Sequence, residues 1–155
     1  MRLRRSQAAL ALALWIGAPL LAKAADVPPP SDVVALGGEV RATEDGSAVV
    51  TVRAAIADGF HVNAHRPDEP YLIPTPLPLR AAGVDFDEPR YPAPKSERFA
   101  FSPDKPLLVY SGTIEITAHA RPFPSEPIRA ELRYQACDDT RCLPPRTISA
   151  MPCIE

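Results

Sequence analysis

The chain has 155 residues and a formal net charge of −2, from 17 basic and 19 acidic residues, so no excess of positive charge favours nucleic acid as a partner. The length suits one domain of the commonest size, with one hydrophobic core. The 20 prolines, most of them between Pro28 and Pro152, leave few windows of helical length and argue against an α-helical fold.

The first 24 residues have the pattern of a cleaved secretory signal. Three arginines precede an apolar run of about 15 residues, and small residues follow at Ala22 and Ala24. The run is short for a membrane span of about 20 residues, with an uncleaved anchor as the alternative. We therefore expect export, removal of residues 1–24, and a soluble domain over residues 25–155 without stable membrane insertion.

Alternation of apolar and polar residues predicts β-strands along the rest of the chain. It is clearest in Ser47–Ala57, Thr113–Ala120 and Ile128–Ala136. The sequence "EDGS" (Glu44–Ser47) is typical of a hairpin turn and joins the first of these strands to "GEVRAT". Further strands are predicted at Phe60–Ala64, Leu77–Arg80, Leu107–Tyr110 and Arg146–Met151.

This number of short strands, about seven to nine in roughly 130 residues, predicts an all-β fold, an antiparallel β-sandwich of the immunoglobulin type. The antibody pattern of cysteine, tryptophan and cysteine is absent, because the sole tryptophan, Trp15, lies in the signal segment. Two proline-rich segments, His65–Pro76 and Glu88–Pro106, are predicted as loops. Long loops of this kind are often functional.

Two cysteines, Cys137 and Cys142, lie close together in the sequence "YQACDDTRCLPP". If the strands Ile128–Ala136 and Arg146–Met151 pair, the cysteines face each other across a short loop, with Cα atoms about 4.5–5.5 Å apart. In an oxidising compartment this geometry predicts a disulfide that leaves Cys153 unpaired. Closing so small a ring contributes only about 2 kcal/mol to the free energy of unfolding.

The pair can be a structural cross-link, half of a metal site, or a redox couple. Zinc suits the spacing of the cysteines, but His61 and His65 lie about 13 Å apart along a strand, so no metal or other cofactor is expected. We interpret the histidines as strand and loop residues without a special role. Asp138 and Asp139 disfavour a nearby thiolate, whereas Arg141 favours one. A loop disulfide is also accessible to other thiols. The residues alone leave the cross-link and the redox couple equally open.

The sequence "YQACDDTRCLPP" resembles the active-site hairpin of the N-terminal periplasmic domain of the DsbD thiol–disulfide interchange proteins. Gly59–Leu79 and Tyr91–Lys95 resemble the same family, and the resemblance covers most of residues 33–151. It implies an immunoglobulin-like fold and a protein-disulfide reductase component located in the periplasm. In that family a thioredoxin-like domain, supplied with electrons across the membrane, reduces the cysteine pair. The pair then reduces disulfide isomerases and thioredoxin-like proteins of cytochrome c maturation.

Carried over by position, the resemblance makes Cys137 and Cys142 the redox couple. It makes Cys142 the thiol that forms mixed disulfides and Cys137 the thiol that resolves them. The family also covers its cysteines with an aromatic ring, which here corresponds to Phe99 or Phe101 in "PKSERFAF". The other residues expected to shape the site are Tyr134, Gln135, Asp138 and Arg141.

Full-length members of the family continue into a membrane domain and a thioredoxin-like domain. Because this sequence ends at Glu155, we expect a separate membrane electron donor, with a repurposed domain as the alternative. Cys153 is expected to be a small buried or frayed-end residue, with an intermolecular disulfide or a further redox role as alternatives. The alternative function is a binding module, in which the disulfide is purely structural and the proline-rich loops hold a partner.

Overall fold

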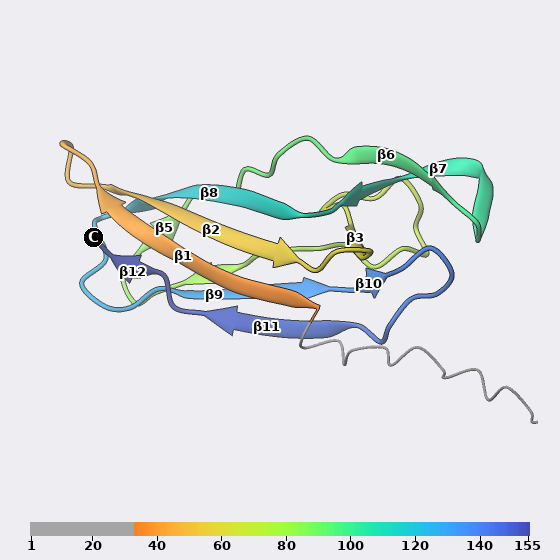
Figure 1. Ribbon diagram of the computed structural model, residues 1–155. Coiled ribbons are helices and arrows are strands. Elements are labelled where there is room, and N and C mark those ends of the chain that lie inside the picture. Colours follow the sequence, from red (N-terminus) through yellow and green to blue (C-terminus); the bar gives the residue numbers. More distant parts are fainter. Residues whose placement is uncertain (1–32) are drawn as a thin grey trace, which may run out of the picture.

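The computed structural model describes residues 33–155, which form β-strands joined by turns and loops, with no helix among them (Figure 1). The strands are β1 (Val34–Ala42), β2 (Ala48–Ile56), β3 (His61–Asn63), β4 (Leu79–Arg80), β5 (Asp85–Phe86), β6 (Lys95–Phe99), β7 (Ser102–Tyr110), β8 (Thr113–Arg121), β9 (Arg129–Tyr134), β10 (Ala136–Cys137), β11 (Arg146–Ala150) and β12 (Cys153–Ile154). The predicted signal, residues 1–24, lies outside the described residues. Residues 33–155 contain no helical segment long and apolar enough to cross a lipid bilayer.

The strands assemble into three sheets, with the orders β12-β1-β2-β8-β5, β10-β3-β7-β6 and β11-β9-β4. Every strand pair in them is antiparallel except β1 with β12, which run parallel. The short strand β10 directly follows β9, so one stretch of chain passes from the third sheet into the second. This architecture confirms the predicted all-β, immunoglobulin-like sandwich.

The strand faces alternate as the sequence predicts. The inward-facing residues of β2, β8 and β9 are buried in one continuous core: Val50, Val52, Ala54, Ile56, Ile114, Ile116, Ala130, Leu132 and Tyr134. Burying an aliphatic or aromatic side chain of this kind contributes about 1.5–3 kcal/mol. The main core therefore outweighs anything that a six-residue disulfide ring can add.

The turn between β1 and β2 is the predicted "EDGS" hairpin. Gly46 has a φ of 79°, a left-handed conformation that glycine adopts without steric cost. The carboxylate of Asp45 accepts hydrogen bonds from the hydroxyls of Thr43 and Ser47 and from the Ser47 amide. These contacts close the turn and fix the register of β1 and β2.

The prediction of a loop over Glu88–Pro106 is wrong, because this segment contains the β6–β7 hairpin. Its prolines suggested irregular chain, yet Pro103 and Pro106 lie where the pairing of the two strands shifts register. No regular ladder there requires a proline N–H, so the strand tolerates them. The other predicted loop, His65–Pro76, is irregular in the structure as expected.

The pairing of β9 with β11 is the feature that builds the cysteine hairpin. Tyr134 lies opposite Arg146, and Ala130 lies opposite Ala150, as expected for two adjacent antiparallel strands. The loop that connects β10 to β11 lies at the same end of the sandwich as the tip of the β6–β7 hairpin (Figure 1). The short strand β12 lies at the opposite end.

Candidate functional site

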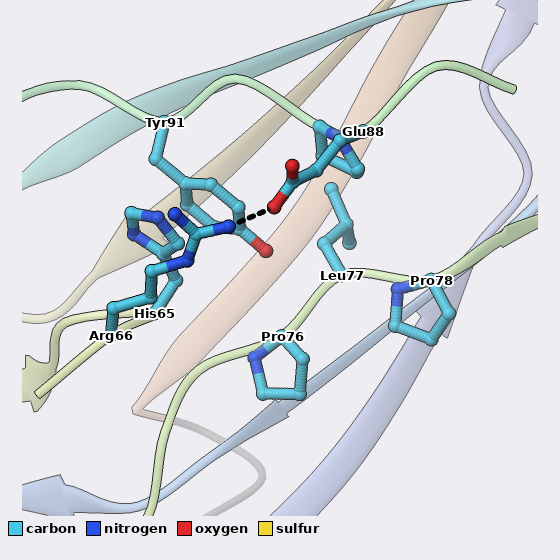
Figure 2. A pocket seen from close by; sticks show the side chains of 8 residues that line it. His65, Arg66, Pro76, Leu77, Pro78, Glu88 and Tyr91 are labelled. Atoms are coloured by element: carbon cyan, nitrogen blue, oxygen red, sulfur yellow. Dashed lines mark hydrogen bonds and ion pairs between the residues drawn. The ribbon is translucent and has the colours of Figure 1, made fainter.

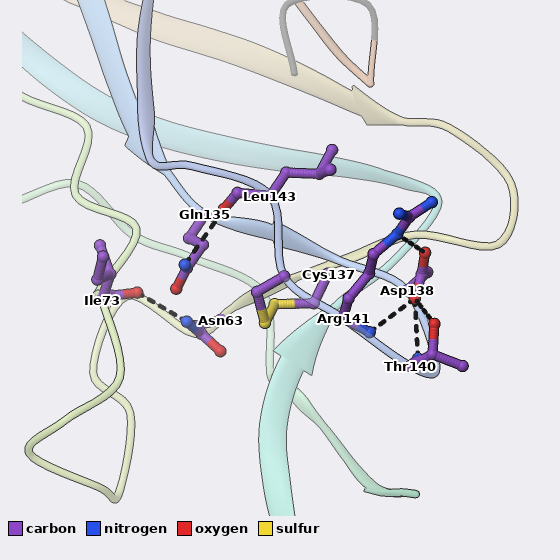
Figure 3. The surroundings of a disulfide bond; sticks show 9 residues. Asn63, Ile73, Gln135, Cys137, Asp138, Thr140, Arg141 and Leu143 are labelled. Carbon is purple, nitrogen blue, oxygen red and sulfur yellow. Dashed lines mark hydrogen bonds and ion pairs between the residues drawn. A yellow bond between two sulfur atoms is a disulfide. The ribbon is translucent and has the colours of Figure 1, made fainter. Parts of the chain in front are cut away.

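The predicted disulfide joins Cys137 and Cys142, whose Cα atoms are 3.9 Å apart (Figure 3). Cys137 is the last residue of β10, and it forms an isolated antiparallel bridge with Cys142. Just outside this bridge, the Leu143 amide donates a hydrogen bond to the Ala136 carbonyl. The bond therefore closes the tip of a hairpin that the backbone already forms.

The two cysteines differ sharply in their exposure to solvent. Cys137 is only 2% exposed, whereas Cys142 belongs to the exposed residues. A thiolate from another protein must approach a disulfide sulfur directly in order to attack it. Of the two cysteines, Cys142 is thus the accessible one.

Asp138 shapes the loop between the cysteines. Its Oδ1 accepts hydrogen bonds from the backbone N–H of Thr140 (2.8 Å), the Thr140 hydroxyl (2.8 Å) and the backbone N–H of Arg141 (2.9 Å). These donors favour the ionised carboxylate and lower the pKa of Asp138 to about 2, with the Thr140 amide the largest contributor. The Asp138 side chain and a hydrogen bond from the Asp138 amide to the Arg141 carbonyl together close the turn.

The pH dependence of this turn follows from the lowered pKa of Asp138. The ionised carboxylate stabilises the turn at pH values above its ordinary pKa of 3.8, and this contribution is lost as the pH falls through about 2. In the folded protein, the amide chemical shifts of Thr140 and Arg141 should titrate with a midpoint near pH 2. Asp138→Asn should abolish that titration. A midpoint near 3.8 would show that the carboxylate does not hold the turn.

Arg141 lies next to Cys142 in the sequence and is paired with a carboxylate in the structure. Its Nε lies 3.5 Å from Oδ2 of Asp138, and about half of its side chain is exposed (Figure 3). The charge that was expected to favour a thiolate is thus shared with a neighbouring carboxylate. Solvent weakens what is left of its effect on the thiol.

Gln135 and Tyr134 occupy the base of the hairpin. The Gln135 side-chain amide donates a hydrogen bond to the Leu143 carbonyl (3.2 Å), which ties the two arms together beyond the disulfide. Tyr134 is fully buried in the main core. Both residues support the loop from the side of the core, and Cys142 remains exposed.

Strand β3 is a part of the site that the sequence interpretation missed. His61 pairs directly with Cys137, and Val62 pairs with Ala136. Val62 and Ala136 belong to the main core, so the alternating residues His61, Asn63 and Cys137 lie on the opposite face of the sheet. His61 and Asn63 are nonetheless buried there.

The loop His65–Pro76 covers this second face. The Asn63 side chain donates a hydrogen bond to the Ile73 carbonyl (3.0 Å), and the Thr75 hydroxyl donates one to the Asn63 carbonyl (2.6 Å). Leu72 of the loop packs against a small second core made of Phe99, Leu107 and Val109. These contacts bury a strand face that its polar sequence would place in water.

The two candidate cap residues, Phe99 and Phe101, lie beside His61, which pairs with Cys137. The ring of Phe99 stacks on His61, with centroids 4.0 Å apart, and the ring of Phe101 stacks on Phe99 at 5.3 Å. Phe99 is buried, whereas Phe101 is 43% exposed at the hairpin tip. An ion pair between Lys105 and Glu69 joins the hairpin to the loop. The aromatic rings thus lie over His61, the residue that pairs with Cys137 across β3 and β10.

A cavity of about 200 Å³ brings the cap and the cysteine loop together. It is lined by His61, Glu97, Phe99 and Asp139, among others. Asp139 comes from the loop between the cysteines, and Glu97 and Phe99 come from β6. Burial lowers the pKa of His61 below its ordinary value of 6.5, and the carboxylates of Glu97, Asp139 and Asp138 partly offset this.

His65 has different surroundings from His61. Its Nδ1 lies 2.8 Å from the Tyr110 hydroxyl, and its ring stacks on Tyr91. These rings border a separate cavity of about 400 Å³ with several prolines and the Arg66–Glu88 ion pair (Figure 2). Burial raises the pKa of Tyr91 to about 12.

In the part of the chain that the structure describes, no three His, Cys, Asp or Glu side chains gather as a metal site would require.

Cys153 is exposed, so the expectation that it is buried is wrong. It lies in β12 opposite Glu39 of β1, and it is exposed with no disulfide partner. The parallel pairing with β1 orders the backbone here, because the Glu155 amide also donates to the Val40 carbonyl. Strand β12 lies at the end of the sandwich away from the cysteine hairpin (Figure 1).

The class of this domain is defined by two features. It is an immunoglobulin-like sandwich, and it carries at one end a hairpin disulfide with one buried and one exposed cysteine. The sequence profile described as "Thiol:disulfide interchange protein DsbD, N-terminal" matches residues 32–152. The chain therefore belongs to the family of DsbD N-terminal domains.

Solved structures show the same fold. The reduced DsbD N-terminal domain of Neisseria meningitidis matches with a TM-score of 0.52 and 21% identity, over 81% of this chain and 89% of that one. The same organism's domain in complex with the PilB N-terminal domain gives 0.53 and 20%, over 81% and 87%. The N-terminal periplasmic domain of ScsB from Proteus mirabilis gives 0.52 and 12%, over 81% and 51%. No curated protein sequence matches the chain significantly.

Proposed function

We propose that this domain is a thiol–disulfide interchange protein that transfers electrons through Cys137 and Cys142. A donor dithiol reduces the pair, and the pair then reduces disulfides of client proteins. The direction of transfer follows the resemblance to the DsbD family. No cofactor takes part, because the two sulfur atoms carry the electrons themselves.

The observation that carries this proposal is the unequal exposure of the two cysteines. In both half-reactions an external sulfur must reach one atom of the pair, and the exposed Cys142 is available for this. The buried Cys137 stays beside Cys142 and can displace the partner afterwards. A purely structural cross-link has no need of such an asymmetry.

Thioredoxin-like proteins are the proposed partners on both sides. A DsbD N-terminal domain from Neisseria meningitidis has been solved in complex with the PilB N-terminal domain, which supports a protein partner for this domain. Disulfide isomerases and the thioredoxin-like proteins of cytochrome c maturation are the proposed clients. The proposed donor is a separate membrane reductase with a thioredoxin-like domain.

The proposed location is the periplasm, reached through a signal over residues 1–24, with residues 25–155 as the mature domain. Related domains such as that of ScsB are described as periplasmic. Mass spectrometry of the mature protein tests the signal directly. A mature N-terminus well upstream of Ala25 would contradict cleavage.

The reduction potential of the Cys137–Cys142 bond tests the function. Structural disulfides have potentials below about −300 mV, whereas exchanging disulfides lie higher. We expect a potential above this limit, measured by equilibration with glutathione and dithiothreitol buffers in a Cys153→Ser background. A value below it would favour the alternative, a binding module with a structural disulfide.

The stability of the fold should depend little on the disulfide. Since the ring contributes about 2 kcal/mol and a separate core supports the strands, the double variant Cys137→Ala with Cys142→Ala should remain folded. Circular dichroism should show an unchanged β-sheet signal, and urea denaturation should show a modest loss of stability. Unfolding of this variant, or of the reduced wild type, would indicate a structural cross-link.

A further inference from the structure

Resolution of a mixed disulfide requires Cys137 to lose its proton in surroundings that oppose this. The residue is buried, and Asp138 and Asp139 follow it directly in the loop. Burial in a poorly solvated site and nearby negative charge both disfavour a thiolate. A proton acceptor close to Cys137 would remove this obstacle.

His61 is in the right place to be that acceptor. It lies directly opposite Cys137 in the antiparallel pair of β3 and β10. Side chains that oppose each other in this way point to the same face, with Cβ atoms about 4.5–5.5 Å apart. The turn that leads into β3 contains Gly59 with a φ of 78°, and the Phe60 amide donates to the Ala57 carbonyl within it. The backbone thus fixes the position of the Cβ atom of His61, from which the imidazole extends.

The surroundings of His61 suit a group that gains and loses a proton. One face of its ring is covered by Phe99, at 4.0 Å and nearly parallel. It also borders the 200 Å³ cavity with Glu97 of β6 and Asp139 of the cysteine loop. These two carboxylates, together with Asp138, are the charged groups that act on it, and they stabilise an imidazolium.

We propose that His61 accepts the proton of the Cys137 thiol during resolution, a role that rests on the proposed interchange function. The imidazole takes the proton, and the Cys137 thiolate attacks Sγ of Cys142. The Cys137–Cys142 bond forms while the bond between Cys142 and the client sulfur breaks. The client sulfur leaves as a thiolate and takes up a proton. Over the full cycle the pair loses two electrons and the client disulfide gains two.

The same group serves the opposite half-reaction. When a donor thiolate attacks Sγ of Cys142, the bond to Cys137 breaks and Cys137 departs as a thiolate. The minor fraction of His61 rings that carry a proton return it to this thiolate, and otherwise the thiolate takes a proton from water. Because burial lowers the pKa of His61, the ring is neutral at neutral pH and ready to accept a proton in the resolving direction.

Two-phase thiolate release from dithiobis(nitrobenzoate) tests this role without any protein partner. The fully reduced domain is used in a Cys153→Ser background, so that only the pair reacts. Attack by Cys142 releases one coloured thiolate, and resolution by Cys137 releases the second. A Cys137→Ala variant, which releases only one, identifies the phases.

His61→Phe keeps the ring stack on Phe99 and removes the base. We expect its second phase to slow about 100-fold, with the first phase unchanged, because general bases typically contribute at least that much. The wild-type second phase should level off above pH 6.5. In the variant it should keep rising to at least the ordinary thiol pKa of about 8.5, because the surroundings of Cys137 disfavour its thiolate. His119→Phe on β8, in a different sheet from β3, is the matched control and should match the wild type.

A second phase slowed by less than about tenfold, or equal slowing of both phases, would overturn the role of His61. His61→Gln gives the same measurement if His61→Phe does not fold. Failure of the wild type to release a second thiolate would instead overturn the interchange function itself. The two failures are therefore distinguishable.

Discussion

Cys137→Ala is expected to form a lasting covalent complex with a thioredoxin-like partner, whereas Cys142→Ala is expected to form almost none. In the first variant the exposed Cys142 can attack, and no second thiol of this chain remains to release the partner. In the second variant the only remaining thiol of the pair is buried, at 2% exposure. The difference should approach complete reaction against none.

The measurement is non-reducing electrophoresis of each variant in a Cys153→Ser background. The partner carries only its exposed active-site cysteine, so it has no second thiol that could release the complex. This cysteine is activated as a mixed disulfide with thionitrobenzoate, which is the leaving group when Cys142 attacks. The variant that lacks both Cys137 and Cys142 is the control for non-specific bonding. Equal trapping by the two single variants would refute the assigned order. Absence of trapping by both would exclude this partner as a client.

Removal of the aromatic cap is expected to make the reduced pair easier to oxidise by small disulfides. Phe99 covers His61, which lies opposite Cys137, and Phe101 extends the stack towards solvent. Each stacked aromatic pair contributes about 0.5–1.5 kcal/mol beyond its buried area. The variant Phe99→Ala with Phe101→Ala should therefore expose Cys137 at least about tenfold more often, since 1.4 kcal/mol corresponds to a factor of ten.

The clearest measurement is the alkylation rate of Cys137 by iodoacetamide in a background that lacks the other two cysteines. Phe99→Ala also costs about 3–5 kcal/mol of stability, so a control must separate local exposure from general loosening. Leu107→Ala serves this purpose, because Leu107 belongs to the same small core as Phe99 and makes no ring stack with His61. If both variants accelerate alkylation equally, the cap has no specific shielding role.

The main sandwich could be predicted from the sequence because its strands bury only one face. In β2, β8 and β9 the alternation of apolar and polar residues is regular, and the structure places the apolar set inside. The β6–β7 hairpin could not be predicted in the same way. Its prolines are tolerated by a local shift in strand register, which depends on the partner strand and leaves no pattern in the sequence.

The cysteine pair could be predicted from its spacing and its flanking strands, but its environment could not. In the segment "HVN" the polar residues His61 and Asn63 alternate with Val62, a pattern typical of a solvent-facing strand side. They are buried because the loop His65–Pro76 and Phe99 fold over them. Such burial depends on contacts between distant segments, so the sequence alone could not predict that His61 lies in a buried position opposite Cys137.

The burial of one cysteine and the exposure of the other limit how the domain can meet its partners. Under the proposed function, donor and client must each bond to Cys142, so they cannot occupy the domain together. Every turnover is then a sequence of separate visits, and each visit transfers one pair of electrons. Such an exchange has ping-pong kinetics, in which an excess of either partner competes with the other for a single atom.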